Sequence, residues 1–243
     1  MLIVSAGMPK SGSAYFYNVL NGLLVAAGFP DARAIKDKYG LTGVMRWHNN
    51  NVDVRLSLLL RLWLISRREG PFVVKTHAAP QPGMRLLTSL RWIRVVYTYR
   101  DPRDVLLSAI DHGQKILEAG EDHTFASLVV FDKAFAAVQT WLETWRAYHA
   151  MPNVLGVKYE DLLADPIRTL RDCEAFLDLD VTDEARTAVL WQYNRDNPQA
   201  VREQMHLNKA VAFRYRTEMS PDQRRRFRDA LGNTLRAMGY AIE

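Results

Sequence analysis

The sequence predicts an α/β fold in which helices cover both faces of a central parallel sheet. Short apolar runs alternate with longer segments whose apolar residues recur at helical spacing. The short runs are apolar at successive positions, which is typical of strands that are buried on both faces. With 243 residues, of which 48% are hydrophobic, the chain can bury a substantial core. We therefore predict a three-layer sandwich that forms a single domain over residues 1–243.

The expected elements follow one another in the order that such a fold requires. Strands are expected at residues 2–6, 72–75, 92–99 and 154–159. Helices are expected at residues 15–27, 56–68, 124–148, 166–177, 182–193 and 220–239, with a further helix that begins at Pro102. The last helix has a typical capping-box start in Ser220-Pro221-Asp222-Gln223. Residues 31–51 and 113–122 are expected to form polar loops.

Composition and charge exclude several classes of protein. The formal net charge of +5 favours anionic ligands, but the basic residues are scattered apart from Arg224-Arg225-Arg226 on an expected helix, so we expect no nucleic-acid partner. The single cysteine, Cys173, excludes an internal disulfide and a cysteine metal cluster. The most apolar helix, at residues 56–65, is too short to span a bilayer. We expect a cytoplasmic protein without a signal peptide or a membrane partner.

The turn from Gly7 to Tyr15 joins the first expected strand to the first expected helix. This geometry aims backbone N–H groups and the positive end of a helix dipole at one point, which suits a phosphate. Lys10 adds a cation, and two serines add hydroxyl donors. Lys10 precedes Gly12, whereas the lysine of a Walker P-loop follows its last glycine. The turn by itself therefore fits a phosphate site or an ordinary capped helix start equally well.

Polar residues follow the ends of all four expected strands. In parallel α/β sheets, ligands bind beyond the carboxyl ends of the strands. The residues at these ends are Lys10, His77, Arg100 and Tyr159. We expect them to belong to one site.

Four motifs, in this order along the chain, make the sequence resemble the sulfotransferase family that uses 3′-phosphoadenosine-5′-phosphosulfate (PAPS). The motifs are Pro9-Lys10-Ser11-Gly12-Ser13, Lys75-Thr76-His77, Tyr99-Arg100-Asp101-Pro102-Arg103-Asp104-Val105 with Ser108, and Lys158-Tyr159-Glu160-Asp161-Leu162 followed by Asp165-Pro166. The resemblance implies a P-loop-NTPase-like fold and one sulfotransferase domain. It also implies PAPS as the co-substrate, adenosine 3′,5′-bisphosphate (PAP) as its product, and no metal.

The resemblance assigns roles to residues of each motif. Lys10, Lys75 and His77 are the expected catalytic residues, with the lysines balancing charge and the histidine taking the acceptor proton. The expected donor-binding residues are Pro9, Lys10, Ser11, Gly12, Ser13, Ala14, Tyr15, Arg100, Ser108, Tyr159 and Lys209. Among them, Tyr15 and Tyr159 are expected at the adenine. Arg100 and Ser108 are expected at the 3′-phosphate.

Three positions depart from the family pattern. Ala14 stands where the family usually has threonine, and Tyr15 stands where it commonly has tryptophan. The family's Arg-Lys-Gly segment is not clearly present near the end of the chain. Residues 206–210 occupy its place, so Lys209 is the expected substitute, with Arg214 or Arg216 as alternatives.

The function predicted from these residues is transfer of a sulfuryl group from PAPS to a hydroxyl, or alternatively an amine, of a small molecule. One alternative is a divergent P-loop kinase or other nucleotide phosphotransferase, against which the order of Lys10 and Gly12 counts. Another is a catalytically silent nucleotide-binding protein, against which the presence of Lys10 and His77 counts. The acceptor is expected to lie against residues 36–52, 78–85 and 113–123.

Overall fold

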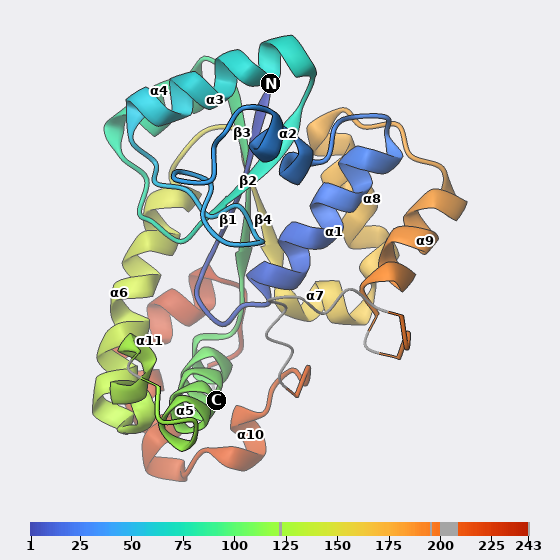
Figure 1. Cartoon of the computed structure of the whole chain (residues 1–243). Helices are drawn as coiled ribbons and strands as arrows, with labels where there is room; N and C mark the ends of the chain where they lie inside the picture. Colours follow the sequence, from blue (N-terminus) through green and yellow to red (C-terminus); the bar gives the residue numbers. More distant parts are fainter. Residues whose placement is uncertain (122, 195, 200–208, 243) are drawn as a thin grey trace. The chain divides into compact units, whose positions relative to one another are not determined.

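The computed structural model describes residues 1–121, 123–194, 196–199 and 209–242 (Figure 1). The chain folds into two compact units, which are described separately. Unit 1 comprises Met1–Tyr99 and Thr144–Leu207, and unit 2 comprises Arg100–Glu143 and Asn208–Glu243.

Unit 1 contains the parallel sheet that the sequence predicts. Its strands are β1 (Leu2–Gly7), β2 (Phe72–Thr76), β3 (Ile93–Tyr99) and β4 (Val154–Lys158), in the spatial order β2-β1-β3-β4. All three strand pairs are parallel, with Val4 of β1 opposite Val74 of β2 and Val95 of β3. β1 lies inside the sheet and is fully buried, so its carboxyl end delivers the following turn to the centre of the sheet edge. The α/β fold prediction is confirmed.

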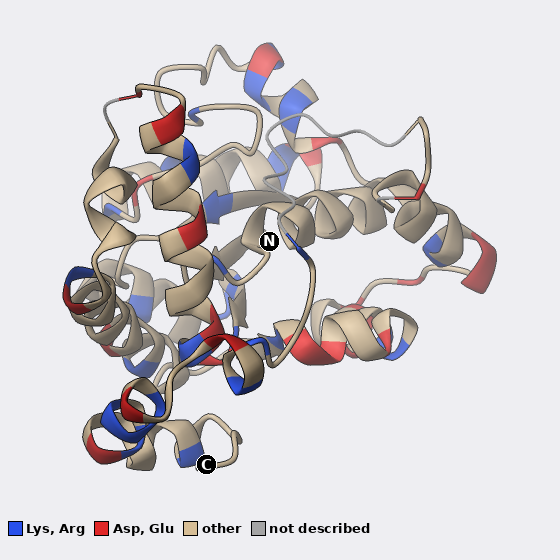
Figure 2. Cartoon of the chain, turned by 90° about the horizontal axis from the view of Figure 1, so that it is seen from below, with Lys and Arg blue, Asp and Glu red and all other residues tan. Residues whose placement is uncertain are grey.

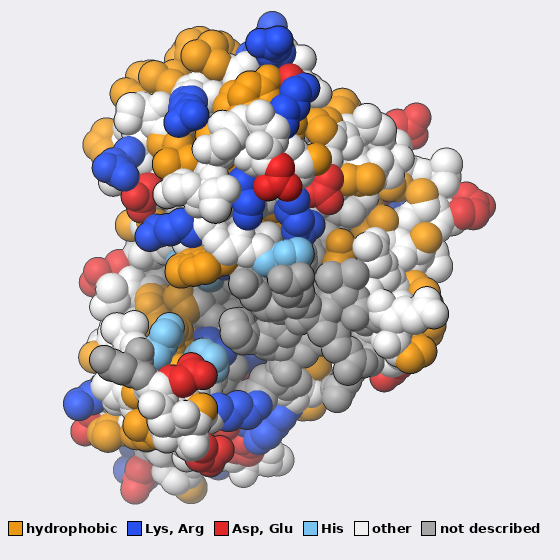
Figure 3. Space-filling view, viewed as in Figure 1, with side chains coloured by type: hydrophobic (Ala, Val, Ile, Leu, Met, Phe, Trp, Pro, Cys, Tyr) orange, Lys and Arg blue, Asp and Glu red, His pale blue; other side chains and the backbone are white. Residues whose placement is uncertain are grey.

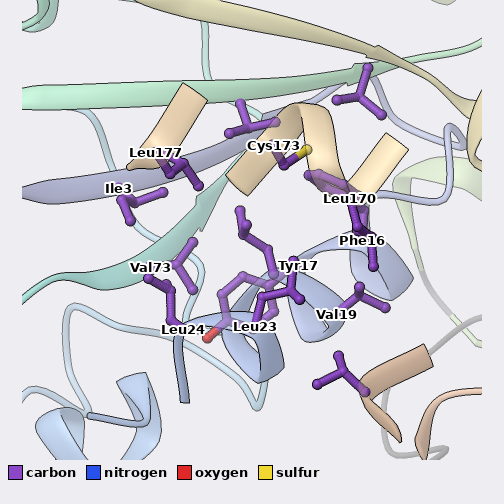
Figure 4. Packing of buried hydrophobic residues seen from close by; sticks show 14 of the residues in the cluster. Ile3, Phe16, Tyr17, Val19, Leu23, Leu24, Val73, Leu170, Cys173 and Leu177 are labelled. Atoms are coloured by element: carbon purple, nitrogen blue, oxygen red, sulfur yellow. The ribbon is translucent and has the colours of Figure 1, made fainter. Parts of the chain in front are cut away.

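Helices cover both faces of this sheet. On one face lie α1 (Ser13–Ala26), α8 (Pro166–Leu177) and α9 (Asp183–Gln192), and on the other lie α3 (Leu56–Glu69) and α4 (Pro82–Ser89) (Figure 1). In the first layer, Ile3 and Val73 of the sheet pack against apolar side chains of α1 and α8 (Figure 4). Cys173 of α8 is fully buried in this cluster, and burial raises the pKa of its thiol. It is a structural thiol.

The segment at residues 31–51 is more ordered than its composition predicts. It forms the short helix α2 (Ala32–Lys38), because the Asp31 carboxylate caps it by accepting a hydrogen bond from the Arg33 N–H at 2.7 Å. The segment then joins the edge of β2 through a parallel bridge between Asn51 and Lys75. The remaining short helix of unit 1 is α7 (Tyr159–Ala164), which begins at the end of β4.

Unit 2 is built from helices. They are α5 (Pro102–Glu118), the 3₁₀ helix η1 (Thr124–Val129), α6 (Phe131–His149, whose last residues belong to unit 1), α10 (Tyr215–Glu218) and α11 (Pro221–Ala237). Figure 2 shows Lys and Arg interspersed with Asp and Glu along the helices. In α11, Arg225 lies 2.9 Å from Asp222, so this part of the arginine triplet is a solvated, ion-paired surface.

Two helix boundaries in unit 2 differ from the sequence prediction. α5 continues through Gly113, where a loop was expected, to Glu118. A Cβ on Gly113 would lie 2.5 Å from the carbonyl oxygen of Phe125. The glycine thus lets η1 pack closely on α5. The expected helix over residues 124–148 is divided, because Val130 adopts an extended conformation between η1 and α6.

Across the described part of the chain, no helix has the length and apolar character needed to cross a bilayer.

Candidate functional site

The turn between β1 and α1 is shaped by two residues with left-handed backbone conformations. Lys10 has φ +66° and Gly12 has φ +74°. A Cβ on Gly12 would lie 2.7 Å from Cε2 of Tyr159, so only glycine lets the tyrosine ring approach the turn so closely. The first intrahelical bond of α1 runs from the Phe16 N–H to the Gly12 carbonyl at 3.0 Å. The preceding N–H groups have no acceptor within the helix and lie at its positive end.

The two serines of this turn have different positions. Ser11 is fully buried, and its hydroxyl donates to the Met8 carbonyl at 2.6 Å and approaches the Thr98 carbonyl at 3.2 Å. Its hydroxyl therefore supports the turn. Ser13 is also buried, but its Oγ lies 3.5 Å from Nε2 of His77. Pro9 and Ala14 are half-buried in the same turn.

His77 is held at the carboxyl end of β2 by contacts on both ring nitrogens. Nδ1 lies 2.7 Å from the carbonyl oxygen of Gly7 at the end of β1. A carbonyl oxygen can only accept, so Nδ1 carries the proton and donates it to this bond. Nε2 lies 2.5 Å from Nζ of Lys75 and faces Ser13. The neutral ring therefore presents its lone pair on the side of the β1–α1 turn.

Burial shifts the titration of both residues. Lys75 is 6% exposed, and burial lowers the pKa of its ammonium to about 8. Among the described residues, no carboxylate lies within ion-pair distance of Lys75. The pKa of His77 lies below its ordinary value, first because of desolvation and then because of the charges of Lys75 and Lys10. His77 is exposed by its accessible surface, so solvent or a ligand has access to the ring and weakens the effect of desolvation.

Two tyrosines border the same turn. Tyr159 begins α7, and its ring lies against Gly12. Burial, followed by the neighbouring Tyr159, raises the pKa of half-buried Tyr15. The structure thus brings together, within unit 1, the sequence-predicted residues Pro9, Lys10, Ser11, Gly12, Ser13, Ala14, Tyr15, Lys75, His77 and Tyr159.

The remaining predicted residues lie in unit 2. Arg100 directly follows β3, is 5% exposed, and donates from Nη2 to the Asp104 carboxylate at 3.0 Å and to the Val211 carbonyl at 2.6 Å. Ser108 is buried on α5, one turn after Asp104. Arg103 binds Asp101 through two nitrogens and lies 3.6 Å from the ring centroid of Tyr215, so it is a structural residue.

The three C-terminal cations have different surroundings. Lys209 is half-exposed, with Nζ 3.5 Å from Glu218 and 4.0 Å from Asp111. Arg214 is buried and lies 2.9 Å from Asp111 and 2.7 Å from Glu218. Arg216 lies over the Phe213 ring. Compared with Arg214, Lys209 has longer ion pairs and a more accessible side chain. Residues 206–208 of its expected motif lie outside the described residues.

Sequence reasoning missed Asp111 as an acidic partner in unit 2, but not Asp104. Asp104 lies in a recognised motif, and its second oxygen accepts from the Tyr215 N–H at 3.0 Å. Asp111 carries no local signal, because its partner Arg214 is distant in sequence. No group of three or more His, Cys, Asp or Glu residues in the described ranges could hold a metal ion.

Comparisons with known proteins identify the family of the chain. The family model described as "Sulfotransferase domain" matches residues 2–239. Sulfotransferase 2A2 of Rattus norvegicus is 31% identical over 117 residues, which cover 46% of this chain and 41% of that protein. The matched stretches span 30% to 60% of the length of this and other curated relatives.

Two solved structures show a similar fold. Mouse sulfotransferase SULT7A1 complexed with PAP has a TM-score of 0.57 and 18% identity, with 97% of this chain and 83% of that chain covered. Retinol dehydratase in complex with androsterone and the inactive cofactor PAP has a TM-score of 0.59 and 17% identity, with 96% and 80% covered. Because the family model spans nearly the whole sequence, this chain belongs to the sulfotransferase domain family.

Proposed function

We propose that this chain transfers a sulfuryl group from PAPS to a hydroxyl group of a small molecule, with His77 as the general base. The observation that carries the proposal is the arrangement around His77. Nδ1–H is fixed on the Gly7 carbonyl, and Nε2 faces Ser13 of the β1–α1 turn and Lys75. A base and a cation thus lie beside a helix start that attracts phosphate.

The residues of unit 1 fit the phosphosulfate end of PAPS. Lys75 is a buried cation without a carboxylate partner in the described chain, and the adjacent N–H groups begin α1. An anion bound there would restore the ordinary pKa of Lys75, because opposite charge favours the ammonium form. Lys10 would balance charge on the departing 5′-phosphate. Tyr15 and Tyr159 would contact the adenine, and Arg100, Ser108 and Lys209 the 3′-phosphate.

The proposed reaction is an in-line displacement at sulfur. PAPS supplies the sulfuryl group together with a good leaving group. The acceptor oxygen forms a bond to sulfur while the bond from sulfur to the 5′-phosphate oxygen breaks, and its electron pair leaves with PAP. The acceptor proton moves to Nε2 of His77. Lys75 must release Nε2 before this transfer, since its ammonium donates to the same lone pair.

A hydroxyl acceptor is proposed first, and an amine remains the alternative substrate. Both lose a proton as the bond to sulfur forms, so the same base serves either acceptor. The relative crystallised with androsterone, a molecule with a hydroxyl group, supports a small-molecule acceptor.

The test is transfer of radiolabelled sulfuryl from PAPS to a panel of phenols, aliphatic alcohols and amines. Parallel reactions contain ATP labelled at its terminal phosphate, with magnesium. We expect labelled sulfate esters with the native protein, loss of the label with His77→Ala, and no transfer from ATP. Transfer from ATP, or tight PAP binding without transfer to any acceptor, would overturn the proposal in favour of a phosphotransferase or a silent binding protein.

A further inference from the structure

α3 and α4 carry an apolar surface that the proposed reaction does not use. The two helices lie side by side, since a Cβ on Gly83 of α4 would lie 2.7 Å from Cβ of Leu56 of α3. Leu56 and Leu64 of α3 are 40% and 60% exposed, and Leu86 of α4 and the following Leu90 are 55% and 49% exposed. Figure 3 shows hydrophobic and basic side chains gathered at the top of the view, over these helices.

This part of the chain is strongly basic. Residues 54–94 contain a single acidic residue, Glu69. The same stretch contains seven arginines, which are Arg55, Arg61, Arg67, Arg68, Arg85, Arg91 and Arg94. Glu69 is engaged by Lys38 at 2.7 Å and by the Tyr39 hydroxyl at 2.5 Å. Three of these arginines are ion-paired, Arg55 with Asp53, Arg68 with Glu69 and Arg94 with Asp178. The other four form no ion pair within the described residues, so the surface keeps a net positive charge.

A cavity at one end of this surface combines cations with aromatic rings. Trp63 and Trp92 stack with ring centroids 4.1 Å apart and an interplanar angle of 7°. Together with Met1, Arg67 and Arg91 they line a cavity of about 340 Å³. Within the described ranges, Arg67 and Arg91 form no hydrogen bond or ion pair with another side chain. Unpaired guanidinium groups beside half-buried tryptophans suit a phosphate group attached to an apolar body.

We propose that this leucine–arginine face of α3 and α4 docks on a membrane surface that contains anionic phospholipids. The exposed leucines enter the acyl boundary, the tryptophans lie at the interface, and Arg67 and Arg91 bind headgroup phosphate. A second copy of this chain fits less well, because pairing the same face would oppose arginines with arginines. An acidic protein fits less well because the leucines project from two adjacent helices and line no groove.

The location of the face is compatible with catalysis at the proposed site. Trp92 precedes β3, so the cavity lies at the amino-terminal edge of the sheet. Lys75 and His77 lie at the carboxyl end of β2. The cavity end of the face, with Arg67 and Arg91, therefore lies at the sheet edge opposite Lys75 and His77. The sequence-based expectation of no membrane partner rested on the absence of a spanning segment, which surface docking does not need.

The test is sedimentation of the full chain with phosphatidylcholine vesicles, with and without phosphatidylglycerol, at low and at high salt. We compare the native protein with Arg67→Glu/Arg91→Glu and with Leu64→Ser/Leu86→Ser. The matched control is Arg225→Glu/Arg228→Glu on exposed positions of α11. All substitutions are at surface positions, and circular dichroism melts verify that each variant is folded.

We expect binding only to the anionic vesicles, weakened by high salt and by about tenfold or more in each α3–α4 variant. The control should bind within about threefold of the native protein. Three results would overturn the proposal. They are absence of native binding at low salt, equal binding by the charge-reversed α3–α4 variant, and a concentration-dependent dimer that the leucine substitutions abolish in the absence of vesicles.

Discussion

The predicted donor-site cations have different surroundings in the two units. In unit 1, Lys75 is buried beside His77 without a carboxylate partner among the described residues, and its pKa falls to about 8. In unit 2, Arg100 pairs with Asp104, and Arg214 pairs with Asp111 and Glu218. Burial makes the charged form of Lys75 unfavourable, and a bound anion would stabilise that form. The arginines of the second group are already ion-paired within the protein, so a phosphate would have to compete with existing carboxylates.

We therefore expect the unit 1 residues to act in the transfer step and the unit 2 residues to bind the donor. Substitutions of the proposed catalytic residues in unit 1 should change turnover, its pH dependence and the free energy of unfolding. Substitutions in unit 2 should change donor affinity or stability, depending on whether the side chain is exposed or buried in its ion pairs.

The largest effect is expected for the proposed base. His77→Ala should lower turnover by about 10²- to 10⁴-fold at saturating donor and acceptor, because the acceptor proton then has no positioned base. PAP affinity, measured by calorimetry, should change little, since the ring acts on the acceptor. His149→Ala, on an exposed position of α6, is the matched control. Near-native turnover in His77→Ala would remove His77 from the mechanism.

The pH dependence of kcat/KM should reflect the lowered pKa values of both His77 and Lys75. A base must be neutral, and the pKa of His77 is lowered, so kcat/KM for the donor should stay level as pH falls through about 6.5. On the alkaline side it should fall above about pH 8, where Lys75 loses its charge. Lys75→Arg should move the alkaline limb upward if the variant remains active. An unchanged alkaline limb in that variant would assign the limb to another group.

The buried charge of Lys75 should also lower stability. Its folded pKa of about 8 lies below its unfolded value of 10.5, so the unfolded state binds more protons between these values. The cost is therefore fully present below pH 8 and disappears as pH rises through about 10.5. Lys75→Met should raise the free energy of unfolding by about 3 kcal/mol at pH 7, as measured in urea, and the gain should vanish near pH 11.

Lys209→Met on a half-exposed position is the control for this titration and should change stability by less than about 0.5 kcal/mol. A destabilised Lys75→Met protein at pH 7 would show that the ammonium makes favourable contacts that offset its burial.

The smallest effects should separate the C-terminal cations. Lys209→Ala should weaken PAP binding by about 1 kcal/mol, in a salt-dependent manner, because its side chain is accessible and its ion pairs are long. Arg214→Ala should instead lower the free energy of unfolding, because it leaves the carboxylates of Asp111 and Glu218 without their buried partner. If Arg214→Gln abolishes PAP binding but leaves the free energy of unfolding unchanged, Arg214 rather than Lys209 binds the donor.

Local signals account for what the sequence predicts well. The apolar strands and the glycine-containing turn after β1 depend on neighbouring residues, so both are visible in one segment of sequence. The close approach of Phe125 to Gly113 brings η1 against a helix formed earlier in the chain. Such tertiary contacts leave little trace in local composition.

In the candidate site, too, residue types are predictable from the sequence, whereas their contacts depend on the fold. The residue types at Lys75 and His77 were predictable, but the choice of Nε2 as the available nitrogen depends on the carbonyl of Gly7 on another strand. Similarly, the basic residues of α3 and α4 are dispersed in sequence, whereas the fold gathers Arg67 and Arg91 at one cavity.

We propose that unit 1 residues act on the transferred group, whereas Arg100 binds the 3′-phosphate. The direct measurement compares calorimetric affinities for PAP and for adenosine 5′-monophosphate, which lacks that phosphate, in the native protein, Arg100→Ala, Arg100→Lys and Lys75→Met. We expect the native preference for PAP, about 2–3 kcal/mol, to collapse in folded Arg100→Ala, to be partly retained in Arg100→Lys, and to persist in Lys75→Met. A full preference for PAP in Arg100→Ala would contradict the account.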